Sequence, residues 1–232
     1  MGDFSFKQFH ICQDRTAMKV GTDGVLLGAW AEGGTRVLDI GTGTGVIALM
    51  MAQRFPESSV VGIDIDADAS SQALENVQAS PFADRVEVVC SSLQDFAAKG
   101  EGVFSSIVSN PPYFEHSLRN SDQARATARH ADTLPFADLF SGVGSLLADD
   151  GVFSAIVPSE SVGSFCSYAH LSGLFVSRQC FVKTTPRKPA RRCLLAFRKH
   201  QPATFEREEV CLQNADGTRS CWYAALTADF YL

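Results

Sequence analysis

The chain has 232 residues, of which 45% are hydrophobic and 20% are charged, and its formal net charge is -6 at pH 7. This length suits one compact domain with a sizeable core and is short for two domains. The sequence has no apolar run of about eighteen residues and no charged-then-apolar start with a cleavage site. We therefore expect neither membrane insertion nor secretion, and a cytoplasmic location.

The cysteines and histidines argue against disulfides and metal sites. Seven cysteines are an odd number, lie far apart and form no C-x-x-C pair, which favours reduced thiols. The five histidines show no metal-ligand spacing either. We expect no bound metal.

Strand and helix signals alternate after an amino-terminal extension, residues 1–35, whose apolar stretch at 25–30 we expect to pack as a helix on the sheet. Strands are predicted at 36–40, 60–65, 86–90, 104–109, 152–157, 175–183 and 193–198. Helices are predicted at 45–55, 67–79, 136–148 and 159–172, the last with Ser159 as its N-cap. The alternation predicts a single α/β domain over 1–232, with a parallel sheet of seven strands covered on both faces.

The first predicted strand runs into a glycine-rich turn at 41–45, whose alternate glycines let the backbone approach a ligand closely. The spacing departs from the dinucleotide pattern G-x-G-x-x-G, because Val46 stands where the third glycine belongs, and Asp39 would disfavour a pyrophosphate. An acid suits the ammonium group of S-adenosylmethionine, a cofactor without phosphate. We expect this cofactor to be bound by Asp39, Gly41, Thr42 and Gly43. The alternative is that Asp39 only serves the entry of the following helix.

The second predicted strand ends in Asp64, about twenty residues beyond the turn. A carboxylate at that spacing can accept both ribose hydroxyls of a nucleoside cofactor. We expect Asp64 and the adjacent Ile65 to contact the cofactor. The alternative is that Asp64 caps the helix that begins near Asp66.

Asn110-Pro111-Pro112-Tyr113 follows the fourth predicted strand and indicates methylation of nitrogen. An exocyclic amino group is a poor nucleophile, and the Asn110 side-chain carbonyl and the Pro111 main-chain carbonyl can each accept one of its N–H groups. The prolines remove competing N–H donors, and Tyr113 offers a face on which a base can stack. The alternative is a turn that ends a strand. The long stretch 111–135 follows, where such folds keep their sites.

Positive charge is concentrated between 161 and 205, a segment with eight lysines and arginines and no acid. The formal charge of that segment is therefore +8, and that of the rest of the chain is -14. The densest cluster lies in a proline-stiffened hairpin at 183–192, which favours phosphate binding, although acids folded nearby could balance it. The residues predicted to contact RNA are Lys183, Arg187, Lys188, Arg191, Arg192 and, from the long loop, Arg129.

With these motifs in place, the chain resembles the bacterial tRNA adenine-N6 methyltransferases that modify the adenosine next to the anticodon of a valine tRNA. The resemblance runs nearly end to end and rests on FKQF at 6–9, DR at 14–15, AMKVGTDG at 17–24, LLGAW at 26–30, LDIGTG at 38–43, SNPPY at 109–113 and LTADFYL at 226–232. It implies a class I methyltransferase fold, Rossmann-like, whose last strand pair is antiparallel, S-adenosylmethionine as cofactor and tRNA as partner.

The resemblance also implies further cofactor contacts. Lys19 and Thr22 would lie near the cofactor carboxylate. Many adenine-N6 enzymes have an acid just after the third strand for the cofactor adenine, whereas this chain has Ser91-Ser92-Leu93. Ser92 and Leu93 are expected at the adenine, with Ser92 or Asp95 replacing the acid.

Two other functions stay open at this point. A glutamine amide fits the same acceptors, so the chain could methylate glutamine in a protein, but enzymes of that kind typically have a helical domain before the glycine turn, and only about thirty-six residues precede it here. Alternatively, the chain could be a non-catalytic nucleic-acid-binding module. The oligomeric state is open, with a monomer expected.

Overall fold

The computed structural model describes residues 2–16, 18–100, 102–112 and 134–232. Its central sheet has eight strands in the order β10-β8-β9-β7-β6-β3-β4-β5. In chain order these are β3 (Arg36–Ile40), β4 (Ser59–Asp64), β5 (Val86–Cys90), β6 (Phe104–Ser109), β7 (Leu147–Pro158), β8 (Phe175–Lys183), β9 (Ala190–Arg198) and β10 (Glu206–Cys211). Strand β9 is antiparallel to both β7 and β8, which confirms the expected antiparallel pair.

The prediction of seven strands was short by one, because β10 was missed. This edge strand runs parallel to β8 and is mostly exposed. Its sequence is Glu-Arg-Glu-Glu-Val-Cys, without the alternation of apolar residues that marks a half-buried strand. Ion pairs from Glu206 to Arg178 and from Glu209 to Lys183 join it to β8 instead. Charged edge strands of this kind discourage pairing with other chains.

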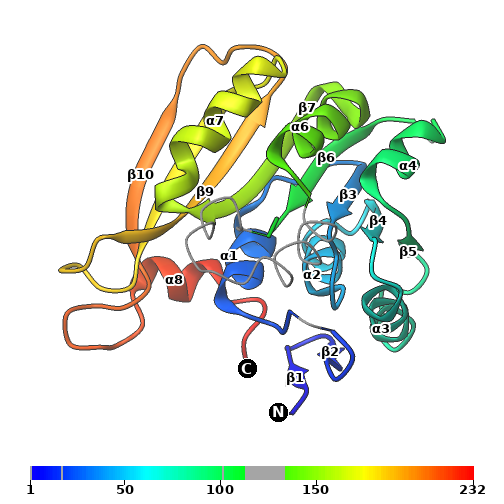
Figure 1. Ribbon diagram of the computed structural model, residues 1–232. Helices are drawn as coiled ribbons and strands as arrows, with labels where there is room; N and C mark the ends of the chain where they lie inside the picture. The colour runs from blue at the N-terminus through cyan, green and yellow to red at the C-terminus, as the bar shows by residue number, and fades with distance from the viewer. Residues whose placement is uncertain (1, 17, 101, 113–133) are drawn as a thin grey trace, which may run out of the picture.

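Helices cover both faces of the sheet (Figure 1). One face carries α1 (Thr22–Trp30), α2 (Val46–Arg54), α3 (Ala67–Gln78) and α8 (Cys221–Leu226); the other carries α4 (Leu93–Ala98), α6 (Phe136–Leu146) and α7 (Val162–Leu171). The four helices predicted between strands are confirmed within a few residues. The cap predicted at Ser159 is wrong, because a 3-10 turn, η1 (Ser159–Ser161), precedes α7 and neither element has a side-chain cap.

Two hydrophobic cores hold the layers together. On one face α2 is buried over seven consecutive residues, because it packs against both the sheet and α1. On the other face four phenylalanines with no exposed surface pack ring against ring: Phe140, Phe153, Phe165 and Phe197. Burying such a side chain stabilises the fold by roughly 2 to 3 kcal/mol.

The strand register brings distant motifs to one edge of the sheet. Ile40, the last residue of β3, pairs with Ser109 at the end of β6 and with Ile63 near the end of β4. The Ser109 hydroxyl donates to the Ile40 carbonyl oxygen over 2.9 Å. The glycine turn, the acid after β4 and the Asn-Pro-Pro motif therefore leave the sheet side by side.

The amino-terminal segment is tied to this edge. A short hairpin, β1 (Phe4–Ser5) and β2 (His10–Ile11), begins it. The buried Asn76 side chain of α3 donates to the carbonyl oxygens of Cys12 and Thr44 and accepts from the Cys12 amide. One amide thus links the segment to the glycine turn. Among the helices in the described ranges, none has the length and hydropathy needed to cross a bilayer.

Candidate active site

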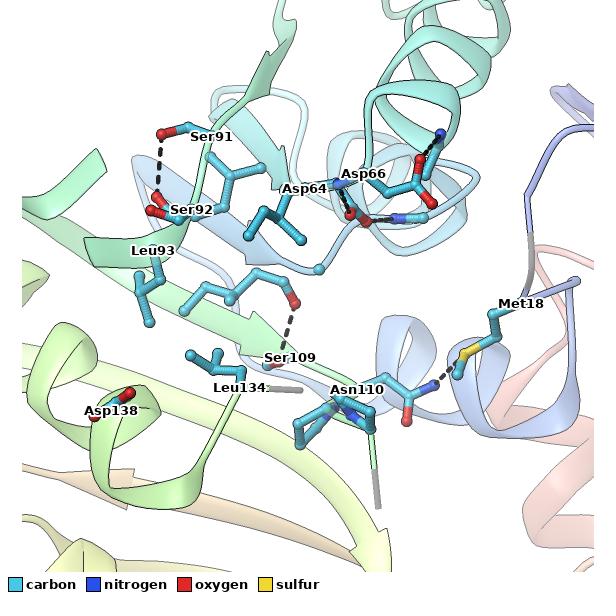
Figure 2. A pocket seen from close by; sticks show the side chains of 18 of the residues that line it. Met18, Asp64, Asp66, Ser91, Ser92, Leu93, Ser109, Asn110, Leu134 and Asp138 are labelled. Carbon is cyan, nitrogen blue, oxygen red and sulfur yellow. Dashed lines mark hydrogen bonds between the residues drawn. The ribbon is translucent and has the colours of Figure 1, made fainter. Parts of the chain in front are cut away.

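A cavity of about 500 Å³ opens at the carboxyl edge of the sheet. Its walls come from the β3–α2 turn, the ends of β4, β5 and β6, the start of α6 and the amino-terminal segment (Figure 2). Nine of the predicted site residues line it: Gly41, Gly43, Asp64, Ile65, Ser92, Leu93, Asn110, Pro111 and Pro112. Motifs separated by up to about seventy residues in the sequence thus share one cavity.

The glycine turn is held in a conformation that L side chains rarely adopt. Gly41, Gly43 and Gly45 have φ values of 72°, 56° and 82°. The amides of Gly41 and Thr42 both donate to the carbonyl oxygen of Ile63 over 2.9 Å. The turn is thus clamped to β4, with Gly41 and Gly43 in the cavity wall.

Asp39 and Thr42 lie beneath the turn and do not line the cavity. Asp39 is fully buried, and one carboxylate oxygen accepts from the Thr42 hydroxyl at 2.7 Å and from the Ala48 amide at 3.1 Å. Ala48 is in the first turn of α2, so this carboxylate oxygen is engaged at the entry of the helix, the alternative considered from the sequence. Burial raises the pKa of Asp39 to about 7.

This pKa predicts a pH-dependent stability. The native state binds the Asp39 proton more tightly than the unfolded chain does, so protonation stabilises the fold at low pH. This stabilisation is lost as pH rises from about 4, near the pKa in the unfolded chain, to about 7, the pKa in the native state. Asp39→Asn retains an oxygen acceptor and removes the titration. Between pH 5 and 7, wild type should lose up to about 1.4 kcal/mol of unfolding free energy per pH unit relative to Asp39→Asn, measured by denaturant unfolding.

The exposed Asp84 provides the control, because Asp84→Asn should leave the pH slope of wild type unchanged. Parallel slopes for wild type and Asp39→Asn would show that Asp39 is already ionised at pH 5.

Asp64 stands beside the turn with its carboxylate at the cavity. One oxygen accepts from the Gly43 amide at 2.8 Å and the other from the Asp66 amide at 3.0 Å. The N-cap of α3 is Asp66, so the alternative role of Asp64 as that cap is not seen. Ile65, which follows, is 63% exposed and lines the cavity.

Asn110, Pro111 and Pro112 of the Asn-Pro-Pro motif line the cavity. The side-chain amide of Asn110 donates to the Met18 sulfur over 3.9 Å (Figure 2). Met18 and Thr16 line the cavity and were missed, whereas Lys19 and Thr22, predicted from the same sequence block, do not line it. The block at 17–24 shows no periodicity from which the residues that face the cavity could be chosen. Tyr113 and Arg129 lie outside the described residues.

Gln94 and Asp138 also line the cavity and were not predicted. Asp138 lies on the side of Ser92 and Leu93, away from Met18 and Asn110 (Figure 2). The Gln94 side-chain amide donates to Asp138 at 3.3 Å. Asp138 is in the first turn of α6, 46 residues after Ser92, so only the packing of α6 against α4 brings them together.

The basic segment is largely neutralised by acids of the fold. Lys183 pairs with Glu209, and Arg192 pairs with Asp23 at 2.7 Å. Three further cations are paired as well: Arg178 with Glu206, Arg198 with Glu32 and Lys199 with Asp149. The hairpin tip retains three exposed cations without an ion pair to any described residue, namely Arg187, Lys188 and Arg191.

A group of possible metal ligands occurs outside the cavity. Ligand atoms of Asp3, His10 and Cys12 lie within 4.8 Å of one another at hairpin β1–β2, a proximity that sequence spacing did not indicate. Asp3 and His10 contact each other at 3.5 Å, and His10 also hydrogen bonds to Ser5. Contacts between exposed side chains of the hairpin account for this approach.

Comparisons with known proteins define the class. The methyltransferase small domain family matches residues 18–134. A protein from Agrobacterium tumefaciens, described as a predicted O-methyltransferase, has the same fold, with a TM-score of 0.70, 18% sequence identity, and coverage of 90% of this chain and 96% of that one. The chain has the class I methyltransferase fold.

Two curated relatives specify the family. The tRNA1(Val) (adenine(37)-N6)-methyltransferase of Bacteroides fragilis strain YCH46 is 45% identical, covering 99% of this chain and 97% of its own length. The protein of the same name from Phocaeicola vulgatus is 47% identical with the same coverage. The chain belongs to the tRNA1(Val) (adenine(37)-N6)-methyltransferase family, which confirms the resemblance drawn from the sequence motifs.

Proposed function

We propose that this enzyme transfers a methyl group from S-adenosylmethionine to N6 of adenosine 37 in tRNA1(Val). The observation that supports this most is the meeting of Asn110 with the glycine turn and Asp64 in one cavity. The names of the curated relatives supply the substrate. A tRNA substrate also implies a cytoplasmic enzyme.

The residues of the cavity fit this cofactor. Its volume, about 500 Å³, is in the usual range for a small-molecule site. Asp64 offers a charged acceptor for ribose hydroxyls, and ideal Cβ atoms at Gly41 and Gly43 would meet nothing within 4 Å, so space is open above the turn. When bound there, S-adenosylmethionine supplies an electrophilic methyl group.

Asn110 and Pro111 act on the substrate amino group. The Asn110 side-chain carbonyl and the Pro111 main-chain carbonyl each accept one N–H, which aims the nitrogen lone pair into the cavity and favours the positive charge that develops on it. Pro111 is buried and cannot donate, so it leaves these acceptors to the substrate. No strong base is needed for this step. The stacking role predicted for Tyr113 remains a prediction.

The hairpin tip is the proposed RNA contact. Strand β9 begins at the carboxyl edge of the sheet, because Arg192 pairs with Pro158 at the end of β7, and β7 is the neighbour of β6. Two strand spacings, about 10 Å, separate β9 from β6, the strand that ends just before Asn110. Arg187, Lys188 and Arg191 therefore project from the same edge as the cavity.

Replacing Arg187, Lys188 and Arg191 together by Gln should weaken tRNA binding and leave cofactor affinity unchanged. If each contacts one phosphate, the slope of log affinity against log salt should fall by about 0.7 to 0.9 per residue. The slope is measured by fluorescence anisotropy at several salt concentrations.

The matched control changes Arg198 and Lys199 to Gln. These cations lie at the other end of β9, at the opposite edge of the sheet, and are paired with Glu32 and Asp149. The control should keep the slope of wild type. Equal slopes for wild type and the triple variant would make the hairpin tip an ordinary solvated face.

The proposed function is tested by offering two acceptors at once. The enzyme is incubated with methyl-labelled S-adenosylmethionine, an unmodified tRNA1(Val) transcript and a glutamine-containing peptide. We expect label in the RNA as N6-methyladenosine. Label in the peptide alone would favour glutamine methylation, and label in neither would favour a binding module.

A further inference from the structure

The far side of the cavity has an acid that no sequence motif indicated. Ser91, Ser92 and Leu93 follow β5 and line the cavity, at the place where the sequence resemblance led us to expect the contact with the cofactor adenine. The Ser91 hydroxyl donates to the Ser92 carbonyl oxygen at 3.1 Å. The Ser92 hydroxyl caps α4, accepting from the Asp95 amide at 3.0 Å and donating to the Asp95 carboxylate at 2.7 Å. Both hydroxyls are thus engaged by the chain itself.

Asp95, the other candidate from the sequence, does not line the cavity. Its carboxylate accepts from Ser92, and together they form the first turn of α4. A carboxylate that hydrogen bonds to the N-cap residue, as Asp95 does to Ser92, stabilises the start of the helix. Neither residue predicted for the adenine contact is therefore placed as an unengaged acceptor.

Asp138 reaches the same side of the cavity from the facing helix. It lies in the first turn of α6, lines the cavity and accepts one hydrogen bond, from Gln94, at 3.3 Å. The N-cap of α6 is Pro135, without a side-chain cap, so Asp138 takes no part in a capping box. A carboxylate has about four lone-pair sites, and Gln94 uses one.

The direction of the cofactor follows from its covalent structure. The sulfonium and the adenine are attached at opposite ends of the ribose, through C4′ and C1′ respectively. The methyl group has to meet Asn110, so with the ribose at Asp64 the adenine extends away from Asn110. Figure 2 shows Ser92, Leu93 and Asp138 on that side.

We propose that Asp138 accepts a hydrogen bond from the exocyclic amino group of the cofactor adenine, and that Gln94 orients its carboxylate. The proposal rests on S-adenosylmethionine as cofactor. It moves adenine recognition from the end of β5 to the start of α6. Asp138 is then a specificity residue, because a carboxylate accepts from an amino group and repels a carbonyl oxygen at the same position.

The test uses two compounds that differ in the group at position 6 of the base and, with it, in whether N1 carries a proton. S-adenosylhomocysteine has a 6-amino group, and S-inosylhomocysteine has a 6-oxo group. Calorimetry with wild type should show at least about tenfold tighter binding of the adenosyl compound, since a site built for a donor rejects an analogue without it. Asp138→Asn can offer N–H to the oxo group, so its preference should fall by about tenfold or more.

Two variants sharpen the result. Asp95→Asn, the matched acid on α4, should keep the preference of wild type. Gln94→Ala should give an intermediate preference, because the carboxylate remains but is less well oriented. Asp138 is exposed, so Asp138→Asn should unfold at the temperature of wild type.

If Asp138→Asn keeps the preference for the adenosyl compound, or if Asp95→Asn loses it, the assignment of Asp138 is wrong. The proposed cofactor is not affected by that result. If wild type binds neither compound, the proposed cofactor is wrong and this inference is wrong with it. The two failures are therefore distinguishable in one set of titrations.

Discussion

Asn110→Ala should lower the rate of methyl transfer in a single turnover by about a hundredfold or more and should leave cofactor affinity within a few-fold of wild type. We expect a large loss because, in the proposed function, the Asn110 carbonyl acts on the nucleophile, whose lone pair is otherwise delocalised into the base. Rapid-quench measurement with saturating enzyme separates this step from product release.

Asn214→Ala is the matched control for that measurement. Asn214 is exposed in a surface turn, hydrogen-bonded to Thr218, and is not part of the cavity wall. The control should transfer methyl at the rate of wild type. A single-turnover rate for Asn110→Ala within a few-fold of wild type would remove the Asn-Pro-Pro motif from the mechanism.

Asp64→Ala is expected to weaken S-adenosylmethionine binding by about 1.5 to 3 kcal/mol, because the ribose hydroxyls lose a charged acceptor. The variant also removes the acceptor for the Gly43 amide, which loosens the turn under the cofactor. Both effects act on binding, so the dissociation constant from calorimetry is the quantity to measure.

Asp66→Ala separates this effect from a general loss of stability. Asp66 caps α3 and also lines the cavity, so its removal should cost about 1 kcal/mol of unfolding free energy and change cofactor affinity less than Asp64→Ala does. If Asp64→Ala, folded as judged by thermal unfolding, binds the cofactor as wild type does, the ribose assignment fails.

The sequence was sufficient for the parts of the fold that are buried on both faces. Strands β3, β4 and β6 read as short apolar runs. Strand β3 runs into the glycine turn, β4 ends in Asp64 and β6 runs into Asn110, so the meeting of these motifs at one edge could be predicted. Strand β10 could not, because a charged edge strand is stabilised by partners on β8 and not by its own pattern.

The site was predicted where motifs are local and missed where packing assembles it. Asp138 joins Ser92 only through the contact between α6 and α4, which no spacing reveals. Asp39 was expected to face a ligand, but an acid near the end of a strand can equally turn inward to the next helix, as it does here. The charge of Lys183 and Arg192 is balanced by acids distant in sequence, so the tip of the hairpin could be identified only from the fold.

Mapping of the modified nucleotide tests the central claim most directly. Two tRNA1(Val) transcripts, one natural in sequence and one with guanosine in place of adenosine 37, are incubated with enzyme and S-adenosylmethionine, digested, and analysed by fragment mass. We predict one added methyl group on the fragment that contains adenosine 37, recovered as N6-methyladenosine, and none on the transcript with guanosine there. Methylation of both transcripts at another nucleotide, or of neither, would contradict the account.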